Sequence, residues 1–200
     1  MAFIRTVAPA EAEGKVSEMY ADAERRFGYV PNWARAFSAR PEVRDRWTAL
    51  LKSIQSNLPV RTYELATLAA ARALRSSYCT LAHGSVLADT VFDAATVAAI
   101  MTDAEPCALE ARERVMMAFV EKVVSNAERM TSDDIDRLRA HGYQDEEIFD
   151  LAATAAARCF FSTRLDALGV QPDAAFSALE PNLRAALTVG RPIGVEPSAG

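Results

Sequence analysis

The sequence predicts an all-α fold with roughly eight helices. Alanine, leucine, arginine and glutamate, which all favour the helical conformation, dominate its composition. Apolar residues recur at spacings of three and four, and the sequence contains no long run of alternating β-branched residues, the pattern typical of strands. Proline, glycine and cap residues interrupt the apolar pattern, and we take them to mark where one helix ends and the next begins.

Several of these interruptions define individual helices. Pro9 and Pro41 each stand where a helix begins, because proline suits the first helical turn, whereas Gly142 and Gly169 stand where helices end. The expected helices cover residues 9–27, a short segment around Trp33, and residues 41–54, 61–74, 78–89, 94–101, 110–126, 133–140 and 144–168. The Gly- and Pro-rich tail is expected to leave the core or to lie on a partner subunit.

The charge and hydropathy of the chain argue against several kinds of partner. The net charge is -5 and the pI is about 5.2, which argues against nucleic acid or an anionic membrane. No segment approaches about 20 uninterrupted apolar residues, the length that crosses a bilayer. The start of the chain has no apolar core of the signal-peptide kind, and three cysteines do not make a disulfide framework. We therefore expect free thiols in a reducing cytoplasm.

The length of 200 residues suits a single all-helical domain over residues 1–200. Within it we expect an N-terminal helical arm over 1–45, a core with the chemical motif over 46–130, a C-terminal helical half over 131–190 and a tail over 191–200. The acidic, alanine-rich pattern of 63–72 recurs at 147–158 without the cysteine and histidine that follow the first copy. This echo is either an internal repeat or the general likeness of alanine-rich helices.

The residues with the clearest chemical potential lie between Glu64 and His83. Cys79 stands four residues before His83, one of only two histidines, so the two side chains share a helix face if this segment is helical. Glu64 stands fifteen residues before Cys79. A thiol beside an imidazole, with a carboxylate within reach, is the minimal set that activates a sulfur nucleophile. The alternative is a structural role, since free cysteines are commonly small buried apolar residues.

The segment Arg75-Ser76-Ser77 is a predicted break between two helices. Along one straight helix Glu64 would lie about 22 Å from Cys79, too far for proton transfer. Two antiparallel helices joined at this break would instead bring the carboxylate to the thiol directly or through a water. The break also places Cys79 in the first turn of a helix, where the dipole stabilises a thiolate, so we expect a lowered pKa of the Cys79 thiol.

The other two cysteines are weaker candidates for a chemical role. Cys107 follows a proline at an expected helix start and would be exposed. Cys159 lies beside two phenylalanines and is expected to pack in the core. Neither has a spacing that singles it out.

The remaining polar candidates are assigned structural roles. His141 precedes Gly142 at a helix end and would cap that end, and Arg72 is the expected partner of Glu64. The sequence has no Walker loop, no G-x-G-x-x-G and no H-E-x-x-H, and its histidines and cysteines are too scattered for a zinc site within one subunit. We therefore expect no cofactor and no metal.

The string from Glu64 to Gly84 resembles the signature of the carboxymuconolactone decarboxylase and alkylhydroperoxidase D superfamily. In the peroxidase branch this signature is a glutamate followed by C-x-x-C-x-x-x-H across a helix break. The segments FGYVPN at 27–32, RPE at 40–42 and RLDALGV at 164–170 are similar to the longer, peroxidase-related members. The resemblance implies the alkylhydroperoxidase D-like helical fold and a homo-oligomer with the site near a subunit interface. Tyr29 and Trp33, expected to be exposed, would agree with such an interface.

The resemblance also implies a role for each residue of the motif. Cys79 matches the second, peroxide-attacking cysteine, His83 matches the motif histidine, and Glu64 matches the glutamate that relays a proton to the thiol. Ser76 stands where the other cysteine belongs, so an internal disulfide at this position is not possible. A one-cysteine cycle is then expected, in which Ser76 hydrogen-bonds the sulfur or the departing oxygen and an external thiol reductant or another cysteine restores Cys79.

The leading interpretation is thus a thiol-dependent, peroxidase-like oxidoreductase that acts on a small peroxide. An alternative from the other branch of the superfamily is a lyase or decarboxylase of a small carboxylated lactone, with His83 as acid and base and arginines holding the carboxylate. A third interpretation, kept open by Ser76, is a non-catalytic descendant that binds a small molecule or a partner.

Overall fold

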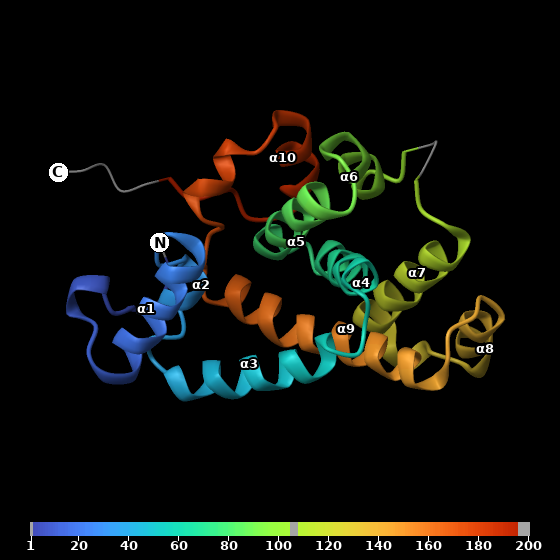
Figure 1. Cartoon of the computed structure of the whole chain (residues 1–200), viewed down its shortest axis with the longest axis horizontal. Helices are drawn as coiled ribbons and strands as arrows, with labels where there is room; N and C mark the ends of the chain where they lie inside the picture. The colour runs from blue at the N-terminus through green and yellow to red at the C-terminus, as the bar shows by residue number, and fades with distance from the viewer. Residues whose placement is uncertain (1, 105–107, 196–200) are drawn as a thin grey trace.

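The computed structural model describes residues 2–104 and 108–195, and these ranges consist of helices and loops (Figure 1). They contain ten α-helices and three short 3-10 helices, so the predicted all-α fold class is confirmed. The α-helices are α1 (Gly14–Phe27), α2 (Asn32–Arg35), α3 (Pro41–Gln55), α4 (Val60–Ala73), α5 (Ser77–Thr90), α6 (Ala94–Met101), α7 (Ala111–Asn126), α8 (Ser132–Ala140), α9 (Asp145–Ala167) and α10 (Pro181–Leu187). The 3-10 helices are η1 (Pro9–Glu11), η2 (Ala127–Arg129) and η3 (Ala174–Ala178).

Most of the predicted helix boundaries agree with the structure to within a residue. The first helix is an exception: it begins at Gly14, because a 3-10 turn precedes it and Gly14 adopts a left-handed φ of 51°. The sequence pattern also does not predict α10, whose first turn is capped by the Glu180 carboxylate accepting from the Leu183 N–H at 2.9 Å. Within the described ranges, every helix is too short or too polar to cross a membrane.

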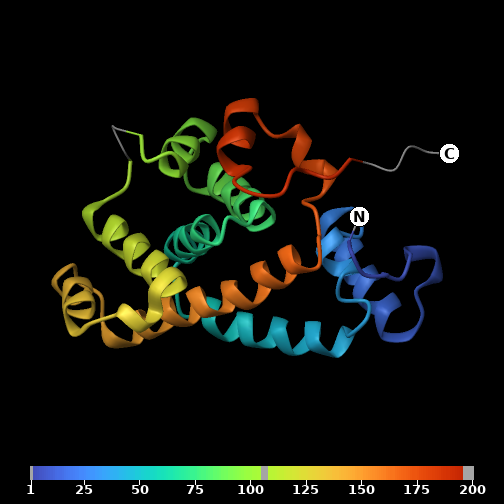
Figure 2. The same ribbon diagram turned by 180° about the vertical axis from the view of Figure 1, so that it is seen from behind.

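Helix α4 lies at the centre of the molecule, with α5, α7 and α9 packed around it, as Figure 1 and the reverse view in Figure 2 show. All residues of α4 from Tyr63 to Ala71 are buried. Four of them are alanines, and these small side chains let the neighbouring helices approach on several sides. Helix α4 is therefore the scaffold against which the other helices are positioned.

The predicted break between α4 and α5 is confirmed. Helix α4 ends at Ala73, α5 begins at Ser77, and Arg75 between them has a left-handed φ of 54°. The Ser76 N–H donates to the Ala71 carbonyl at 3.0 Å, which satisfies one of the carbonyls left free at the end of α4. The chain reverses direction at this point, so that α5 packs along α4.

Helix α10 and the residues after it cover the beginning of α5. The Thr80 hydroxyl donates to the Leu187 carbonyl, and the Gly190 N–H donates to Ser77 Oγ at 2.7 Å. A Cβ at Gly84 would lie 2.4 Å from Leu187 Cδ2, so this glycine allows α10 to lie directly on α5. Helix α10 thus closes one side of α5 near its first turns.

Aromatic residues attach the N-terminal helices to the second half of α9. Trp33 is half-buried, and its ring centroid lies 6.2–6.3 Å from those of Phe27, Phe37 and Phe161. Tyr29 is half-buried as well, and burial raises the pKa of its hydroxyl to about 12. The expectation that Tyr29 and Trp33 are exposed is therefore wrong, because Trp33 packs on Phe161 of α9 and Tyr29 lies near Asp173, and both partners are far away in the sequence.

Candidate functional site

Three side chains from three helices form one hydrogen-bonded network: Glu64 from α4, His83 from α5 and Arg158 from α9. Glu64 Oε2 lies 2.6 Å from His83 Nδ1, and Arg158 Nη1 lies 3.0 Å from His83 Nε2. Glu64 and Arg158 are buried, with 6% and 2% of their surface exposed, whereas 19% of the His83 side chain is exposed. The imidazole is therefore the most accessible member of this network.

The hydrogen bonds define the protonation state of His83. A guanidinium only donates hydrogen bonds, so His83 Nε2 accepts from Arg158 and carries no proton. The ring proton then sits on Nδ1, which donates it to the Glu64 carboxylate. His83 is thus a neutral bridge between a buried anion and a buried cation.

Arg158 is a buried cation without a carboxylate partner in the described part of the chain. Besides His83, its hydrogen-bond partner is the Tyr63 hydroxyl, which accepts from Nη2 at 3.4 Å. The rings of Trp47 and Phe161 have their centroids 5.6 Å from the guanidinium carbon. The Nε atom of Arg158 is buried and has no hydrogen-bond partner. The negative charge of Glu64 reaches this cation only through His83.

Cys79 lies in the first turn of α5, as the sequence predicts, and is only 1% exposed. The Ser162 hydroxyl, from α9, donates to Cys79 Sγ at 3.0 Å. The four residues of the sequence motif therefore gather where α4, α5 and α9 meet, although the hydrogen-bond partner of the thiol is a serine of α9 rather than His83.

Burial raises the pKa of the Cys79 thiol above its ordinary value of 9.0. The positive charge of Arg158 and the hydroxyls of Ser162 and Ser76 act in the opposite direction and lower this pKa, but burial has the larger effect. The predicted lowering of the thiol pKa is therefore wrong. The sequence indicates the start of a helix at Cys79 but not that the thiol is buried, with Ser162 of α9 against its sulfur.

Ser76 is the residue before α5 and is completely buried. Its hydroxyl forms no hydrogen bond of good geometry, yet it lies close enough to the Cys79 thiol and the Asp166 carboxyl to lower the pKa of both. Burial raises the pKa of Asp166, so Ser76 offsets part of that rise. Ser76 thus lowers the pKa of both the thiol and an acidic side chain.

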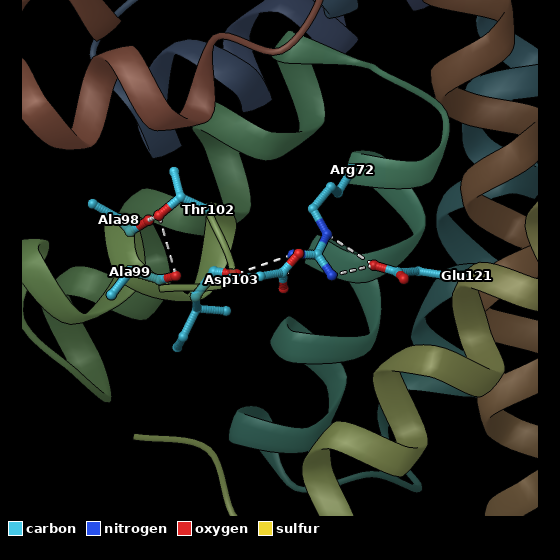
Figure 3. A network of polar contacts seen from close by, with 7 residues as sticks. Arg72, Ala98, Ala99, Thr102, Asp103 and Glu121 are labelled. Carbon is cyan, nitrogen blue, oxygen red and sulfur yellow. Dashed lines mark hydrogen bonds and ion pairs between the residues drawn. The ribbon is translucent and has the colours of Figure 1, made fainter. Parts of the chain in front are cut away.

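Arg72, the expected partner of Glu64, lies in a different network (Figure 3). Its Nε and Nη2 atoms donate to Glu121 Oε1 at 2.8 and 2.5 Å, and Nη1 donates to Asp103 at 2.8 Å. The Ile100 carbonyl also accepts from Nη1, at 3.0 Å. The expected pairing is wrong because eight residues separate Arg72 from Glu64, which places them two turns apart on α4.

A comparison with known protein families finds one that resembles part of this chain. Residues 41–122, which include the whole motif from Glu64 to His83, match the sequence profile of the Carboxymuconolactone decarboxylase family. This part of the chain is therefore similar to the carboxymuconolactone decarboxylase family, and the fold is that of alkylhydroperoxidase D-like proteins. A comparison with curated proteins gave no match.

Solved structures of alkylhydroperoxidase D-like proteins share the architecture of most of the chain. An uncharacterised peroxidase-related protein with an alkylhydroperoxidase AhpD core from Ralstonia eutropha JMP134 matches with a TM-score of 0.78 and 21% identity, over 88% of this chain and 94% of that one. An uncharacterised peroxidase-related protein from Silicibacter sp. TM1040 matches with a TM-score of 0.72 and 20% identity, over 86% and 94%. The debrominase Bmp8 in complex with 2,3,4-tribromopyrrole matches with a TM-score of 0.68 and 18% identity, over 91% and 94%. At these identities the likeness shows the fold alone.

The other residues considered from the sequence lie apart from this superfamily motif. Cys159 in α9 is partly exposed rather than packed in the core as expected, while Cys107 lies outside the described residues. His141 ends α8, where its Nδ1 lies 2.8 Å from the Arg137 carbonyl, in line with a cap. Within the described ranges, no three histidine, cysteine or acidic side chains come together as a metal site would require.

Three residues of the site are not singled out by the sequence motif: Tyr63, Arg158 and Ser162. Arg158 does leave a signal, since it is the only charged residue between Asp150 and Arg164 in α9. A lone charge within an apolar helical stretch indicates either a buried functional group or a buried ion pair. Ser162 follows Arg158 by four residues, which places both on the helix face toward α4 and α5.

Proposed function

We propose that this chain is a thiol-dependent, peroxidase-like oxidoreductase in which Cys79 is the attacking sulfur. The observation that carries the proposal is the setting of Cys79, in the first turn of α5 with the Ser162 hydroxyl 3.0 Å from its sulfur. The nearby charge of Arg158 lowers the pKa of the thiol, and His83, which pairs with Glu64 of α4, lies one helical turn further along α5. Likeness to peroxidase-related proteins supports the class of reaction.

The proposed reaction transfers one oxygen atom. The Cys79 sulfur attacks the distal oxygen of a hydroperoxide, so that an S–O bond forms and the O–O bond breaks. The sulfur is oxidised to a sulfenic acid, the peroxide is reduced, and the leaving oxygen takes up a proton to depart as an alcohol or water. Arg158 and the Ser162 hydroxyl stabilise the negative charge on sulfur as the proton leaves it.

The buried thiol keeps its proton until the substrate binds, because burial raises its pKa. The Glu64–His83 pair is the proton carrier of this proposal. His83 Nε2 takes the thiol proton once Arg158 shifts away from it, and the Glu64 carboxylate stabilises the resulting imidazolium. The imidazolium then supplies a proton to the leaving oxygen.

Recovery of the thiol requires an external reductant. Ser76 stands close to the sulfur but has no thiol with which to form a disulfide. One external thiol displaces water from the sulfenic acid and forms a mixed disulfide with Cys79. A second external thiol then attacks the mixed disulfide, which frees the Cys79 thiol and joins the two external thiols in a disulfide. The cycle therefore consumes two equivalents of a small thiol for each peroxide.

Replacement of each described cysteine tests the proposal. Cys79→Ser is expected to abolish thiol-dependent reduction of tert-butyl hydroperoxide, measured as peroxide consumed in the presence of excess dithiothreitol. Cys159→Ser, a matched change in α9, is expected to retain wild-type turnover. Equal turnover by wild type and Cys79→Ser would remove the sulfur mechanism.

A decarboxylase or lyase reaction on a small carboxylated lactone is the second candidate. The observation that favours it is the direct contact between a buried guanidinium, Arg158, and the imidazole of His83. The first group would hold a substrate carboxylate and the second would transfer the proton. On this alternative, Cys79→Ser retains lactone turnover, whereas His83→Gln loses it.

A further inference from the structure

The hairpin of α7 and α8 contains a cleft that shares no residue with the candidate site. The two helices lie side by side at the opposite end of the molecule from α1, as Figure 1 shows. Lys122 Nζ lies 2.8 and 2.6 Å from the two carboxylate oxygens of Asp134, and this ion pair joins the second half of α7 to the first turn of α8. The pair lines one part of a cleft of about 360 Å³, a volume that a small molecule can fill.

The side chains that line the cleft come from one face of each helix. Those of α7 are spaced as the residues of a single helix face are, and they include Arg114, Val115, Ala118, Phe119 and Lys122. Arg137 of α8 and His141 at the end of α8 line the same cleft. The cleft is thus a groove between two helices.

Two arginines of the cleft, Arg114 and Arg137, have no carboxylate partner within the described residues. Arg114 donates to the backbone carbonyl of Leu109, and the side chain of Arg137 has no hydrogen-bond acceptor in this part of the chain. By contrast Arg139, on the same helix as Arg137, binds the Asp145 carboxylate through two nitrogens, at 2.8 and 3.1 Å. The charges of Arg114 and Arg137 are therefore left without a counter-charge on the two sides of one groove.

The cleft has an excess of two positive charges. Three cations line it, Arg114, Lys122 and Arg137, and the carboxylate among the described lining residues is that of Asp134. His141 is neutral in this count, because its Nδ1 donates the ring proton to the Arg137 carbonyl at 2.8 Å. An excess of positive charge in a concave site concentrates anions there, even in a chain whose net charge is -5.

The wall of the cleft between these charges is apolar. Val115, Ala118 and Phe119 form it, and of these Phe119 is buried and Val115 half-buried. An apolar surface beside cations suits a ligand with an apolar body and a negative end, because the body leaves water while the charge stays paired. A simple inorganic anion would use only the charges.

We propose that the cleft between α7 and α8 binds a small phosphate monoester with an apolar group. A phosphate monoester carries close to two negative charges at neutral pH, which matches the excess of positive charge. Arg114 from α7 and Arg137 from α8 bind its oxygens, since a guanidinium presents parallel N–H groups that fit phosphate. The apolar group lies on the apolar wall of α7. This site is independent of the reaction proposed for Cys79.

The test is isothermal titration calorimetry of the wild-type protein with phenyl phosphate at low ionic strength, because salt screens exposed charges. Phenyl phosphate is expected to bind saturably. Inorganic phosphate lacks the apolar group and benzoate has only one negative charge, so each is expected to bind at least about threefold more weakly. The two comparisons test the apolar wall and the excess of charge separately.

Substitutions of arginines locate the binding. Arg114→Gln and Arg137→Gln each remove one charge of the cleft and are expected to weaken phenyl phosphate at least about threefold. Arg129→Gln is the matched control, because Arg129 is an exposed arginine between α7 and α8 that pairs with the adjacent Glu128 at 3.6 Å. It makes the same change in net charge and is expected to leave the affinity unchanged.

Two changes at Ala118 test the cleft from within. This residue lines the cleft and is exposed, so longer side chains there extend into the groove without disturbing the core. Ala118→Glu supplies a negative charge of the protein's own, whereas Ala118→Gln has the same shape without the charge. Phenyl phosphate is expected to bind Ala118→Glu at least about threefold more weakly than Ala118→Gln.

Three results would overturn the proposal. The first is that phenyl phosphate does not bind saturably, or binds no more tightly than inorganic phosphate or benzoate. The second is equal affinity in Arg114→Gln, Arg137→Gln and Arg129→Gln, which would place the binding elsewhere. The third is equal affinity in the two Ala118 variants. Should Arg114→Gln fail to fold because the bond to the Leu109 carbonyl is lost, Arg137→Gln decides, since its side chain has no such bond to lose.

Discussion

Two arginines, one within helix α4 and one that packs against it from α9, have different surroundings. Arg72, in the last turn of α4, donates to the carboxylates of Glu121 and Asp103 and to a backbone carbonyl. Arg158, which contacts the first turn of α4 through Tyr63, donates to an imidazole and a phenol. The first arginine connects α4 to α7 and to the end of α6, whereas the second lies beside the thiol and the imidazole of the candidate site.

The difference separates a structural arginine from a functional one. Each donor of Arg72 in these contacts has an oxygen acceptor, and two of its partners are charged, so the pairing offsets the cost of taking the cation out of water. Arg158 is buried more deeply, and its Nε atom has no hydrogen-bond acceptor to offset the cost of burying the cation. A charge retained under such conditions can act on a thiolate or on a substrate anion, and sites of this kind are enriched in functional residues.

The largest expected effect comes from Arg158→Gln. Glutamine can still donate a hydrogen bond to His83 but removes the positive charge that lowers the pKa of Cys79. We expect the rate constant for the reaction of Cys79 with hydrogen peroxide to fall about 100-fold, the size typical of losing one preorganised electrostatic contact. Pre-steady-state kinetics of sulfenic acid formation measures this rate constant.

Arg72→Gln is the matched change in the other network. It removes a comparable charge from the opposite end of α4 and is expected to leave the rate constant within about twofold of wild type, as for sites without a role in the reaction. Equal losses of rate in the two variants would contradict the distinction between the two arginines.

For stability, we expect the larger effect from the change at Arg72 and the smaller one from the change at Arg158. Arg72→Met leaves the partly buried Glu121 without its cation, and we expect it to lower the free energy of unfolding by about 1–2 kcal/mol. Arg158→Met removes a poorly compensated buried cation, and the freed His83 Nε2 can take up a proton to pair with Glu64. Urea denaturation should therefore show a smaller loss for Arg158→Met than for Arg72→Met. The opposite order would identify Arg158 as a structural residue.

Ser162→Ala is expected to have a moderate effect on the thiol. It removes the hydroxyl that donates to Cys79 Sγ and lowers the pKa of the thiol. A neutral hydrogen bond contributes about 1 kcal/mol, so the rate of Cys79 alkylation by iodoacetamide should fall about fivefold. Thr163→Ala, the exposed neighbour on α9, is expected to leave this rate unchanged. A loss of equal size in both variants would assign the effect to α9 as a whole.

The smallest effect is on the pH dependence of stability. The pKa of Cys79 is raised in the folded state, so above the ordinary thiol value of 9.0 the unfolded chain loses a proton that the folded chain keeps. The unfolded state then binds fewer protons, and stability falls as pH rises, by at most about 1.4 kcal/mol per pH unit. Urea denaturation between pH 8 and about 10 should show a steeper fall for wild type than for Cys79→Ala. Parallel curves would mean that the thiol is not shifted upward.

The sequence predicts the local half of the site. The Arg75-Ser76-Ser77 segment indicates the break, and the break brings Glu64 to His83 and places Cys79 in a first turn. These are consequences of helix caps and of side-chain spacing within about twenty residues of chain. The residues that set the character of the site, Arg158 and Ser162, come about eighty residues later.

The wrong predictions for Cys79, Arg72 and Trp33 have the same physical origin. The pKa of Cys79 depends on its burial, to which α9 contributes through Ser162, and the partner of Arg72 depends on where α7 lies. Trp33 is half-buried because Phe161 packs on it. In each case the neighbour that decides the outcome is distant in the sequence. Helix propensity and periodicity do not tell which distant helix packs against a given residue.

The central claim, that Cys79 is the reactive thiol of this fold, has one direct test. The wild-type protein is treated with one equivalent of hydrogen peroxide in the presence of dimedone, which traps sulfenic acids, and each cysteine-containing peptide is then quantified by mass spectrometry. Cys107 and Cys159 in the same chain serve as internal comparisons. The account predicts that Cys79 is labelled first and most completely. Labelling of Cys107 or Cys159 while Cys79 stays unmodified would contradict it.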